Sequence, residues 1–146
     1  MDETDIKILK ELVNDARLSY NEIARRIGIA VGTVAARISN LEKQGVIKGY
    51  SAIVDAEKLG YDVVAVIEVI VSGGKLTEVE GEVAKNPNVY GVYDVTGPSD
   101  AVLITRFKNR RELSKFVKSL LALKFVERTI THVALATIKE DLRAPL

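Results

Sequence analysis

The side chains best suited to binding a charged partner are basic residues gathered in one segment. Residues 17–50 hold six basic side chains and two acidic ones, whereas residues 51–146 hold thirteen of each sign. Within the basic segment, Arg37 and Asn40 are of the types that donate to guanine and adenine edges in the DNA major groove. Most exposed Arg and Asn side chains only solvate a helix, so the surrounding pattern has to decide.

Residues that would serve enzyme chemistry are scarce. The chain has 146 residues, no cysteine and a single histidine, His132. These counts exclude disulfides and thiol catalysis and leave no His-rich or thiolate metal site and no conventional Ser-His-Asp triad, so we expect no cofactor. Asp94 and Asp100 flank a turn, but no base, nucleophile or metal cluster accompanies them. An enzyme is therefore the least supported function.

The composition, 47% hydrophobic and 28% charged, is that of a globular protein. The longest apolar runs, residues 63–67 and 69–71, are separated by Glu68 and fall well short of the roughly 20 residues needed to span a bilayer. The acidic N-terminus lacks the basic and then apolar stretches of a secretory signal. We therefore expect a cytoplasmic protein with no membrane partner.

Two predicted helices precede the candidate DNA-reading residues. The first begins after Asp2 and ends near residues 14–15, and its apolar residues recur at spacings of three and four. These residues are Ile6, Leu9, Leu12 and Val13. The second follows a capping box of Ser19 and Glu22, and Gly28 supplies the positive φ that ends it. Its inward-facing residues are Ile23, Ala24 and Ile27.

A third helix is predicted from about residue 31 to residue 44, after a short turn. Its buried face carries Val34, Ile38 and Leu41, and Gly45 ends it. Two helices joined in this way have helix-turn-helix spacing. The opposite side of the third helix exposes Thr33, Ala36, Arg37 and Asn40, with Gly32 near its first turn. We therefore predict that this helix enters the major groove of double-stranded DNA.

Side chains outside the third helix are predicted to hold the DNA backbone. They are the hydroxyl of Ser19, the basic groups of Arg25 and Arg26, and Lys48 after the third helix. Residues 45–55 alternate in polarity and contain two glycines, which predicts a short strand pair that forms a wing. The same alternation is expected of any connecting strand.

The second half of the chain predicts a sheet covered by helices. Strands are expected at residues 63–71, 89–96, 101–107 and 126–138, and helices at residues 75–85 and 110–121. This order is the ferredoxin-like βαββαβ plan, with both helices on one face. The fold class is therefore α+β. Its expected parts are a winged helix-turn-helix domain at residues 1–50, a hinge strand or linker at residues 51–61, and the ferredoxin-like domain at residues 62–146.

The strand predicted at residues 63–71 is apolar on both faces. One face carries Val63, Ala65, Ile67, Val69 and Val71, and the other carries Val64, Val66 and Ile70. Helices cover only one face, and a monomer does not leave such a surface in water. We therefore predict that a second copy covers it, which gives an obligate homodimer.

Several motifs resemble, in order and spacing, the Lrp/AsnC family of transcription regulators, also called feast/famine regulatory proteins. The resemblance is carried by residues 2–9, 19–24, 34–41 and 45–47. It implies a winged helix-turn-helix, a hinge strand, and a C-terminal domain that dimerises, often assembles into octamers and binds an amino acid between dimers. One departure is Ala30, where family members commonly have a serine that caps the third helix.

The resemblance also implies an effector site. The family's effector loop corresponds to Gly97, Pro98, Ser99 and Asp100. There Asp100 would pair with the ammonium group of an amino acid, and backbone amides would receive its carboxylate. Thr129 and Thr131 are expected to line the same pocket, whereas His132 faces the other way and packs in the sheet. Taken alone, residues 97–100 also fit an ordinary hairpin turn.

The predicted function is a sequence-specific DNA-binding transcription regulator modulated by an amino-acid effector. One alternative is an architectural DNA-binding protein without effector control. Another is a small-molecule-binding regulatory subunit whose helix-turn-helix contacts a protein. Sequence preference and the salt dependence of binding separate these functions.

Overall fold

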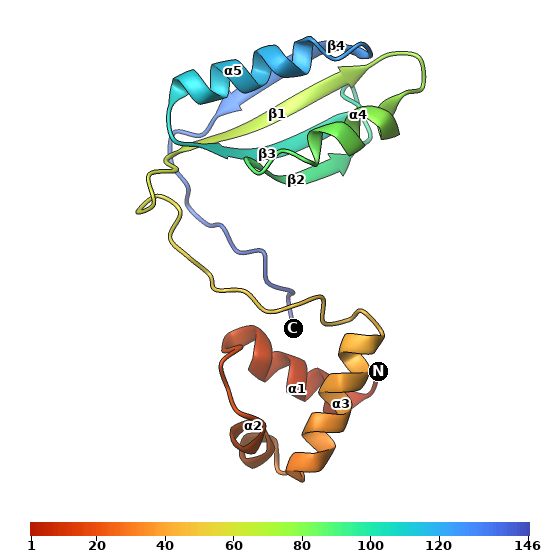
Figure 1. The fold of residues 1–146 in the computed structure, drawn as a ribbon, viewed down its shortest axis with the longest axis vertical. Coiled ribbons are helices and arrows are strands. Elements are labelled where there is room, and N and C mark those ends of the chain that lie inside the picture. The colour runs from red at the N-terminus through yellow and green to blue at the C-terminus, as the bar shows by residue number, and fades with distance from the viewer. The chain divides into compact units, whose positions relative to one another are not determined.

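The computed structural model describes residues 1–146, which divide into two compact units (Figure 1). One unit comprises Met1–Ile53 with Glu140–Leu146, and the other comprises Val54–Lys139. The first holds the helices α1 (Glu3–Asn14), α2 (Tyr20–Ile27) and α3 (Val31–Lys43). The second holds β1 (Val63–Val71), α4 (Leu76–Val83), β2 (Val89–Asp94), β3 (Ala101–Phe107), α5 (Arg110–Leu121) and β4 (Val126–Val133). None of these helices has the length and apolar character to cross a membrane.

The ends of the first three helices follow local signals in the sequence. At α1, the backbone N–H of Asp5 donates to the Asp2 carboxylate at 2.9 Å, and the N–H of Asp2 donates back to Asp5 at 2.8 Å. At α2, the N–H of Glu22 donates to the Ser19 hydroxyl at 3.2 Å, and Gly28 ends the helix with a φ of 73°. The reciprocal bond of the predicted capping box, from the N–H of Ser19 to the Glu22 carboxylate, is absent, and that carboxylate accepts from Arg26.

The predicted capping defect of α3 is confirmed, since Ala30 occupies the N-cap and offers no side-chain acceptor. The N–H groups of the first turn of α3 therefore have no side-chain acceptor at the cap position. The buried face of this helix is also confirmed, since Val34, Ile38 and Leu41 are almost fully buried.

The most buried residue of α1 is not one of those that the spacing predicted. Ile8 is fully buried and packs with Ile23 and Ile38, whereas the predicted Ile6 and Val13 are only half-buried. The remaining predicted residues of the stripe, Leu9 and Leu12, are buried as expected. Because α1 contacts both α2 and α3, its buried face is broad, and its centre lies between the two edges that the spacing rule selected.

The predicted strand pair at residues 45–55 is wrong, since no strand lies between α3 and β1. The two parts of this segment do not pair with each other, and the first unit contains no strand with which either could pair. Ile53 and Val54 in this segment are largely exposed.

The second unit is built on a four-stranded antiparallel sheet in the order β2-β3-β1-β4. The bounds of β1, β3 and α5 match the prediction, and β2 and α4 are each slightly shorter. The last strand ends at Val133 rather than at residue 138. Its partner β1 begins at Val63, and the N–H of Ala134 makes the last bond along that edge, to Val64.

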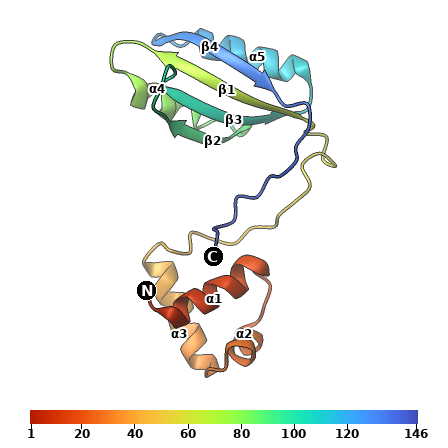
Figure 2. The same ribbon diagram turned by 180° about the vertical axis from the view of Figure 1, so that it is seen from behind.

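Both helices cover one face of the sheet, as predicted (Figure 2). The core between them is formed by alternate residues of β1 and β3 together with α4 and α5, and its members include Ile67, Leu103, Phe107, Val79 and Phe116. Leu121, at the end of α5, is half-exposed and lies outside this core. Its neighbour Leu120 takes the sheet-facing position, and successive helical residues differ by about 100° in direction.

The other face of the sheet carries no helix (Figure 2). We call it the open sheet face; its apolar members are Val64, Val66 and Ile70 of β1, Val102 and Ile104 of β3, and Ile130 of β4. All of them are partly exposed in a single chain. The prediction that β1 has two apolar faces and that helices cover one of them is therefore confirmed.

Candidate functional site

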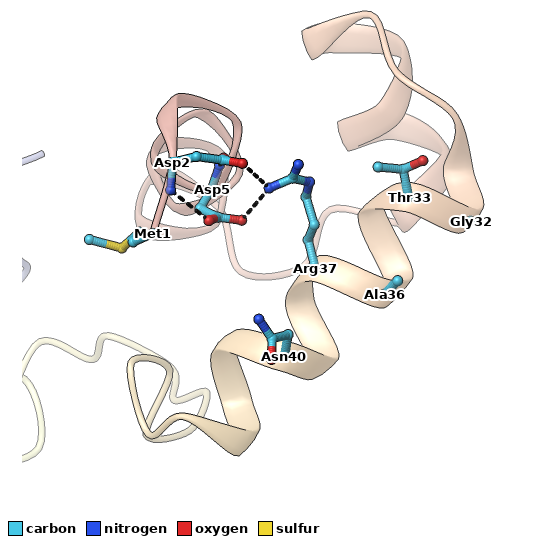
Figure 3. Close-up of a pocket in the computed structure, with 8 residues that line it drawn as sticks. All are labelled: Met1, Asp2, Asp5, Gly32, Thr33, Ala36, Arg37 and Asn40. Carbon is cyan, nitrogen blue, oxygen red and sulfur yellow. Dashed lines mark hydrogen bonds and ion pairs between the residues drawn. The ribbon is translucent and has the colours of Figure 1, made fainter.

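A groove of about 670 Å³ runs along the exposed side of α3. Five predicted DNA-binding residues of α3 line it together with Met1, Asp2 and Asp5, and these five are Gly32, Thr33, Ala36, Arg37 and Asn40 (Figure 3). They share a face because their spacings of three and four residues match the helical repeat. We call this surface the α3 groove.

Within the α3 groove, Arg37 binds two carboxylates of α1 and its cap. Its Nη1 lies 2.7 Å from Oδ2 of Asp2 and 2.9 Å from Oδ1 of Asp5 (Figure 3). The Arg37 side chain is 31% exposed and that of Asp5 is 14% exposed, so the cluster lies at the wall of the groove. The start of α1 at Asp2 is predictable from neighbouring residues, whereas this contact between two helices is not.

The electrostatics of the cluster favour its ionised form. The N–H of Asp5, and then the Arg37 guanidinium, hold the pKa of Asp2 below its ordinary value. The N–H of Asp2 and the same guanidinium lower the pKa of Asp5. The two carboxylates in turn raise the pKa of Arg37. All three groups are therefore charged at neutral pH.

The predicted phosphate-binding residues differ in whether other side chains of the protein already bind them. Arg25 and Lys48 are exposed, and neither forms an ion pair within the chain. Arg26 is held by Glu11 at 2.8 Å and by Glu22 at 3.3 Å. Ser19 accepts the N–H of Glu22, which leaves its hydroxyl proton available to donate.

A hydrogen bond joins the segment after α3 to that helix. The hydroxyl of Tyr50 donates to the carboxylate of Glu42 at 2.9 Å. Burial, and then this carboxylate, raise the pKa of Tyr50 to about 12. Its hydroxyl is therefore neutral and already engaged at physiological pH.

In the second unit, the predicted effector residues 97–100 form the turn between β2 and β3. The N–H of Asp100 donates to the Val69 carbonyl at 3.0 Å, and the N–H of Val71 donates to Oδ2 of Asp100 at 2.7 Å. Gly97 has a φ of 120°, which a residue with a side chain rarely adopts. Gly97 and Pro98 are exposed, whereas Ser99 is buried. The turn is thus fastened to the end of β1.

Ser99 belongs to a second polar cluster, which also involves the open sheet face. Its hydroxyl donates to one carboxylate oxygen of Glu68, and Nε2 of His132 lies 2.9 Å from the other. The Ser99 hydroxyl and then His132 lower the pKa of Glu68. His132 faces away from Thr129 and Thr131, as expected. The sequence signal for this cluster is Glu68 itself, a single acid within an apolar strand.

The two threonines of β4 lie on the face of the sheet that α4 and α5 cover. Thr129 is aligned with Val69 and Thr131 with Ile67. Asp100 bonds to Val69 from the opposite side of β1, so the turn and Thr129 are about 10 Å apart across that strand. Thr129 is half-buried and Thr131 is exposed.

A second groove, of about 470 Å³, lies between α4 and β2. It contains the carboxylates of Glu80 and Asp94, and burial, followed by the charge of Asp94, raises the pKa of Glu80. No group of three His, Asp or Glu side chains is placed to hold a metal ion in this groove or elsewhere in the chain.

Two family models match the chain, one in each half. Residues 1–48 match the model described as winged helix-turn-helix DNA-binding. Residues 64–144 match the model described as Lrp/AsnC ligand binding domain. The second match alone covers more than half of the chain.

Individual relatives agree with these matches. An uncharacterised helix-turn-helix-type transcriptional regulator of Pyrococcus furiosus is 46% identical over 98% of this chain and 97% of its own length. The helix-turn-helix-type transcriptional regulator FL11 of Pyrococcus horikoshii is 41% identical over 100% of this chain and 97% of its own. A crystal structure of a Neisseria meningitidis transcriptional regulator in complex with L-methionine has a TM-score of 0.90 at 28% identity, and the match covers 99% of this chain and 96% of that one.

Proposed function

The chain belongs to the Lrp/AsnC family of transcription regulators, and from this premise we propose that it binds specific DNA sequences through α3 and responds to an amino acid. It is a helix-turn-helix regulator with a ligand-binding domain rather than an enzyme. We assign DNA binding to residues 1–50, a hinge to residues 51–61, and dimerisation and effector binding to residues 62–146. The α3 groove is the observation that carries the DNA-binding proposal.

The proposed reading surface is the row of side chains on α3. Asn40 has the donor and acceptor that fit an adenine edge, and Arg37 has donors for guanine. Ala36 offers a methyl group to thymine, and Gly32 and Thr33 let the first turn approach the DNA closely. This mixture of donors and small residues is what a major groove accommodates.

The proposed backbone contacts come from residues beside α3. Arg25 and Lys48 are exposed and unpaired, so they reach a phosphate without giving up a contact. The Ser19 hydroxyl donates while it still caps α2. Arg26 must exchange Glu11 for a phosphate, so we expect it to contribute less than Arg25.

We propose that two copies pair through their open sheet faces. Covering the valine and isoleucine side chains there removes apolar surface from water, which stabilises the pair by about 25 cal/mol per Å². A homodimer places two α3 helices on a pseudo-palindromic site, with half-sites about 34–36 Å apart or at multiples of that distance. We also propose that these dimers assemble into octamers.

The proposed effector is a free amino acid held at residues 97–100. Asp100 uses Oδ2 to accept the N–H of Val71, which leaves Oδ1 for an ammonium group. Gly97 is exposed, and we expect its N–H to receive the carboxylate. The complex of the Neisseria relative with L-methionine supports this ligand class. Because the target is genomic DNA, we place the protein in the cytoplasm.

Fluorescence anisotropy across a salt series tests DNA recognition. The duplex upstream of the protein's own gene is compared with a scrambled duplex. Arg37→Ala is expected to weaken binding by about 1–3 kcal/mol, and only on the specific duplex. Lys48→Ala should weaken binding to both duplexes and reduce the slope of affinity against salt concentration. If Arg37→Ala lowers the affinity for both duplexes equally, Arg37 does not recognise a base. Tight wild-type binding to any duplex without preference would instead support an architectural protein.

The effector proposal is tested with the same duplex and pooled amino acids. The pool is expected to change the DNA affinity of the wild type by about 1–3 kcal/mol, the usual range of such coupling. Asp100→Ala should abolish this response, and Asp62→Ala, which removes an exposed acid outside the turn, should leave it intact. An unchanged amino-acid response in Asp100→Ala would refute the assignment of the site.

A further inference from the structure

The contact between Arg37 and α1 uses only one of the three guanidinium nitrogens. Both carboxylates bind Nη1. The other two nitrogens have no hydrogen bond within the chain and point away from the two aspartates (Figure 3). Nε–H and Nη2–H lie along one edge of the planar guanidinium, so a complete two-donor edge remains free.

A free two-donor edge matches a specific kind of acceptor. The O6 and N7 atoms of guanine are two acceptors side by side on one base edge, and a guanidinium edge binds both at once. A long arginine side chain on an open helix surface has many rotamers, and binding must select one of them at an entropic cost. Here Asp2 and Asp5 already select one rotamer in the free protein.

We propose that Asp2 and Asp5 are positioning residues for sequence recognition, which fix Nη1 of Arg37 so that its Nε–Nη2 edge faces a base with two adjacent acceptors. This inference rests on the proposed function, because it requires α3 to occupy the major groove. It makes the N-terminus of α1 part of the recognition surface, although acidic side chains repel the DNA backbone.

Repulsion and positioning predict opposite effects when the two charges are removed. If the carboxylates only repel phosphates, their removal raises affinity for every duplex by the same factor. If they position Arg37, their removal lowers the ratio of specific to non-specific affinity, whatever happens to affinity as a whole. The ratio is therefore the decisive measurement.

The experiment uses the full-length protein and the double variant Asp2→Asn with Asp5→Asn. Asparagine retains the oxygen that caps a helix, so the caps of α1 are kept while both charges are lost. Glu3→Gln is the matched control, because Glu3 lies between the two aspartates, pairs with Lys7 and does not contact Arg37. The wild type first selects its preferred sequence from a random duplex library, and anisotropy then compares that duplex with a scrambled one.

We expect the ratio of specific to non-specific affinity to fall at least about fivefold in the double variant. In Arg37→Ala the same ratio should fall by as much or more. Adding Arg37→Ala to the double variant should lower the ratio no further than Arg37→Ala alone. Glu3→Gln should keep the wild-type ratio. Thermal melting of each variant confirms that the first unit is folded at the assay temperature. If the double variant melts too low, the single variant Asp2→Asn takes its place, and its ratio should fall by a smaller factor than expected for the double variant, because Asp5 still binds Arg37.

Three results overturn the inference, and the third is distinguishable from the first two. If the wild type enriches a sequence and the double variant retains the wild-type ratio, the positioning role is wrong while the proposed function stands. The same conclusion follows if Glu3→Gln lowers the ratio equally. If the wild type enriches no sequence, the proposed function fails and the positioning role fails with it.

Discussion

The α3 groove and the open sheet face are built in opposite ways. The groove is lined by exposed polar and small side chains, and its charged groups sit at its wall. The sheet face carries six valine and isoleucine side chains, with the pair of Glu68 and His132 among them and with Arg106, Arg128 and Tyr93 on the same face. A polar surface stays in water and exchanges its contacts with a charged partner, whereas an apolar surface gains most from being covered by a like surface. The two units are thus suited to different partners.

A charge placed on the open sheet face is expected to have the largest effect. Ile104 lies at the centre of β3, between Val66 and Gly91. In a dimer, Ile104→Asp would bury an unpaired charge, which costs about 3–5 kcal/mol of association free energy per charge. We therefore expect the dissociation constant of the dimer to rise by about a hundredfold or more. Light scattering at micromolar concentration should then report monomers.

The control for this variant is Thr77→Asp, which adds the same charge on an exposed position of α4. It should leave the mass unchanged. A wild-type protein that is already monomeric would contradict the idea that the sheet face is covered by a second copy.

A core substitution in each unit tests whether the two surfaces are supported separately. Ile8 is fully buried in the first unit, and Ile67 is fully buried in the second. Ile8→Ala should cost about 2–5 kcal/mol and lower the melting temperature of the first unit, and with it DNA binding. Ile67→Ala should cost a similar amount in the second unit and weaken dimerisation. Calorimetry that shows both variants shifting a single common transition would contradict this separation.

The missing cap of α3 provides a smaller and opposite effect. Ala30→Ser supplies the hydroxyl that the N-cap lacks, and we expect a gain of about 1 kcal/mol in the free energy of unfolding. Ala35→Ser, in the interior of α3, is the matched control and should be neutral or slightly destabilising. Thermal melting of the first unit measures both changes. Equal responses of the two variants would show that capping does not limit the stability of this helix.

Acid should produce the smallest effect, and it should act on both polar clusters with the same sign. The folded-state pKa values of Asp2 and Asp5 lie below their ordinary value of 3.8, and that of Glu68 lies below its ordinary 4.5. Their stabilising contributions are therefore complete above those values and are lost as pH falls through the lowered pKa values. Melting curves from about pH 6 to about pH 3 should show this decline.

A matched pair of variants assigns the acid effect to each cluster. Asp2→Asn with Asp5→Asn should flatten the pH dependence of the first unit, and Glu68→Gln that of the second. If the pH dependence of the melting temperature stays unchanged in both variants, other carboxylates control stability in acid.

The sequence predicted those features that depend on neighbouring residues. Ser19 and Gly28 set the ends of α2, and the β-branched run at Val63–Val71 defines β1. The helix-turn-helix and the order of the second unit follow from such local signals. The predicted strand pair at residues 45–55 failed because alternation alone does not provide a neighbouring strand.

The contacts inside the candidate sites were harder to predict because they join distant parts of the chain. Arg37 is 35 residues from Asp2, and Ser99 is 31 residues from Glu68. Residue types and helical spacing placed Arg37 on the correct face of α3, yet whether its guanidinium is free depends on how α1 packs against that helix. The assignments of individual DNA-binding and effector-binding residues therefore remain predictions.

The single acid in β1 also matters while the chain is still folding. Because β1 is apolar on both faces, a slip of one residue in its pairing would exchange the two faces with little change in hydrophobic burial. Such a slip would bury the Glu68 carboxylate beneath the helices without Ser99 or His132, which is costly. We therefore expect Glu68 to disfavour the slipped register and the misaligned sheets that copies of this nine-residue strand could form.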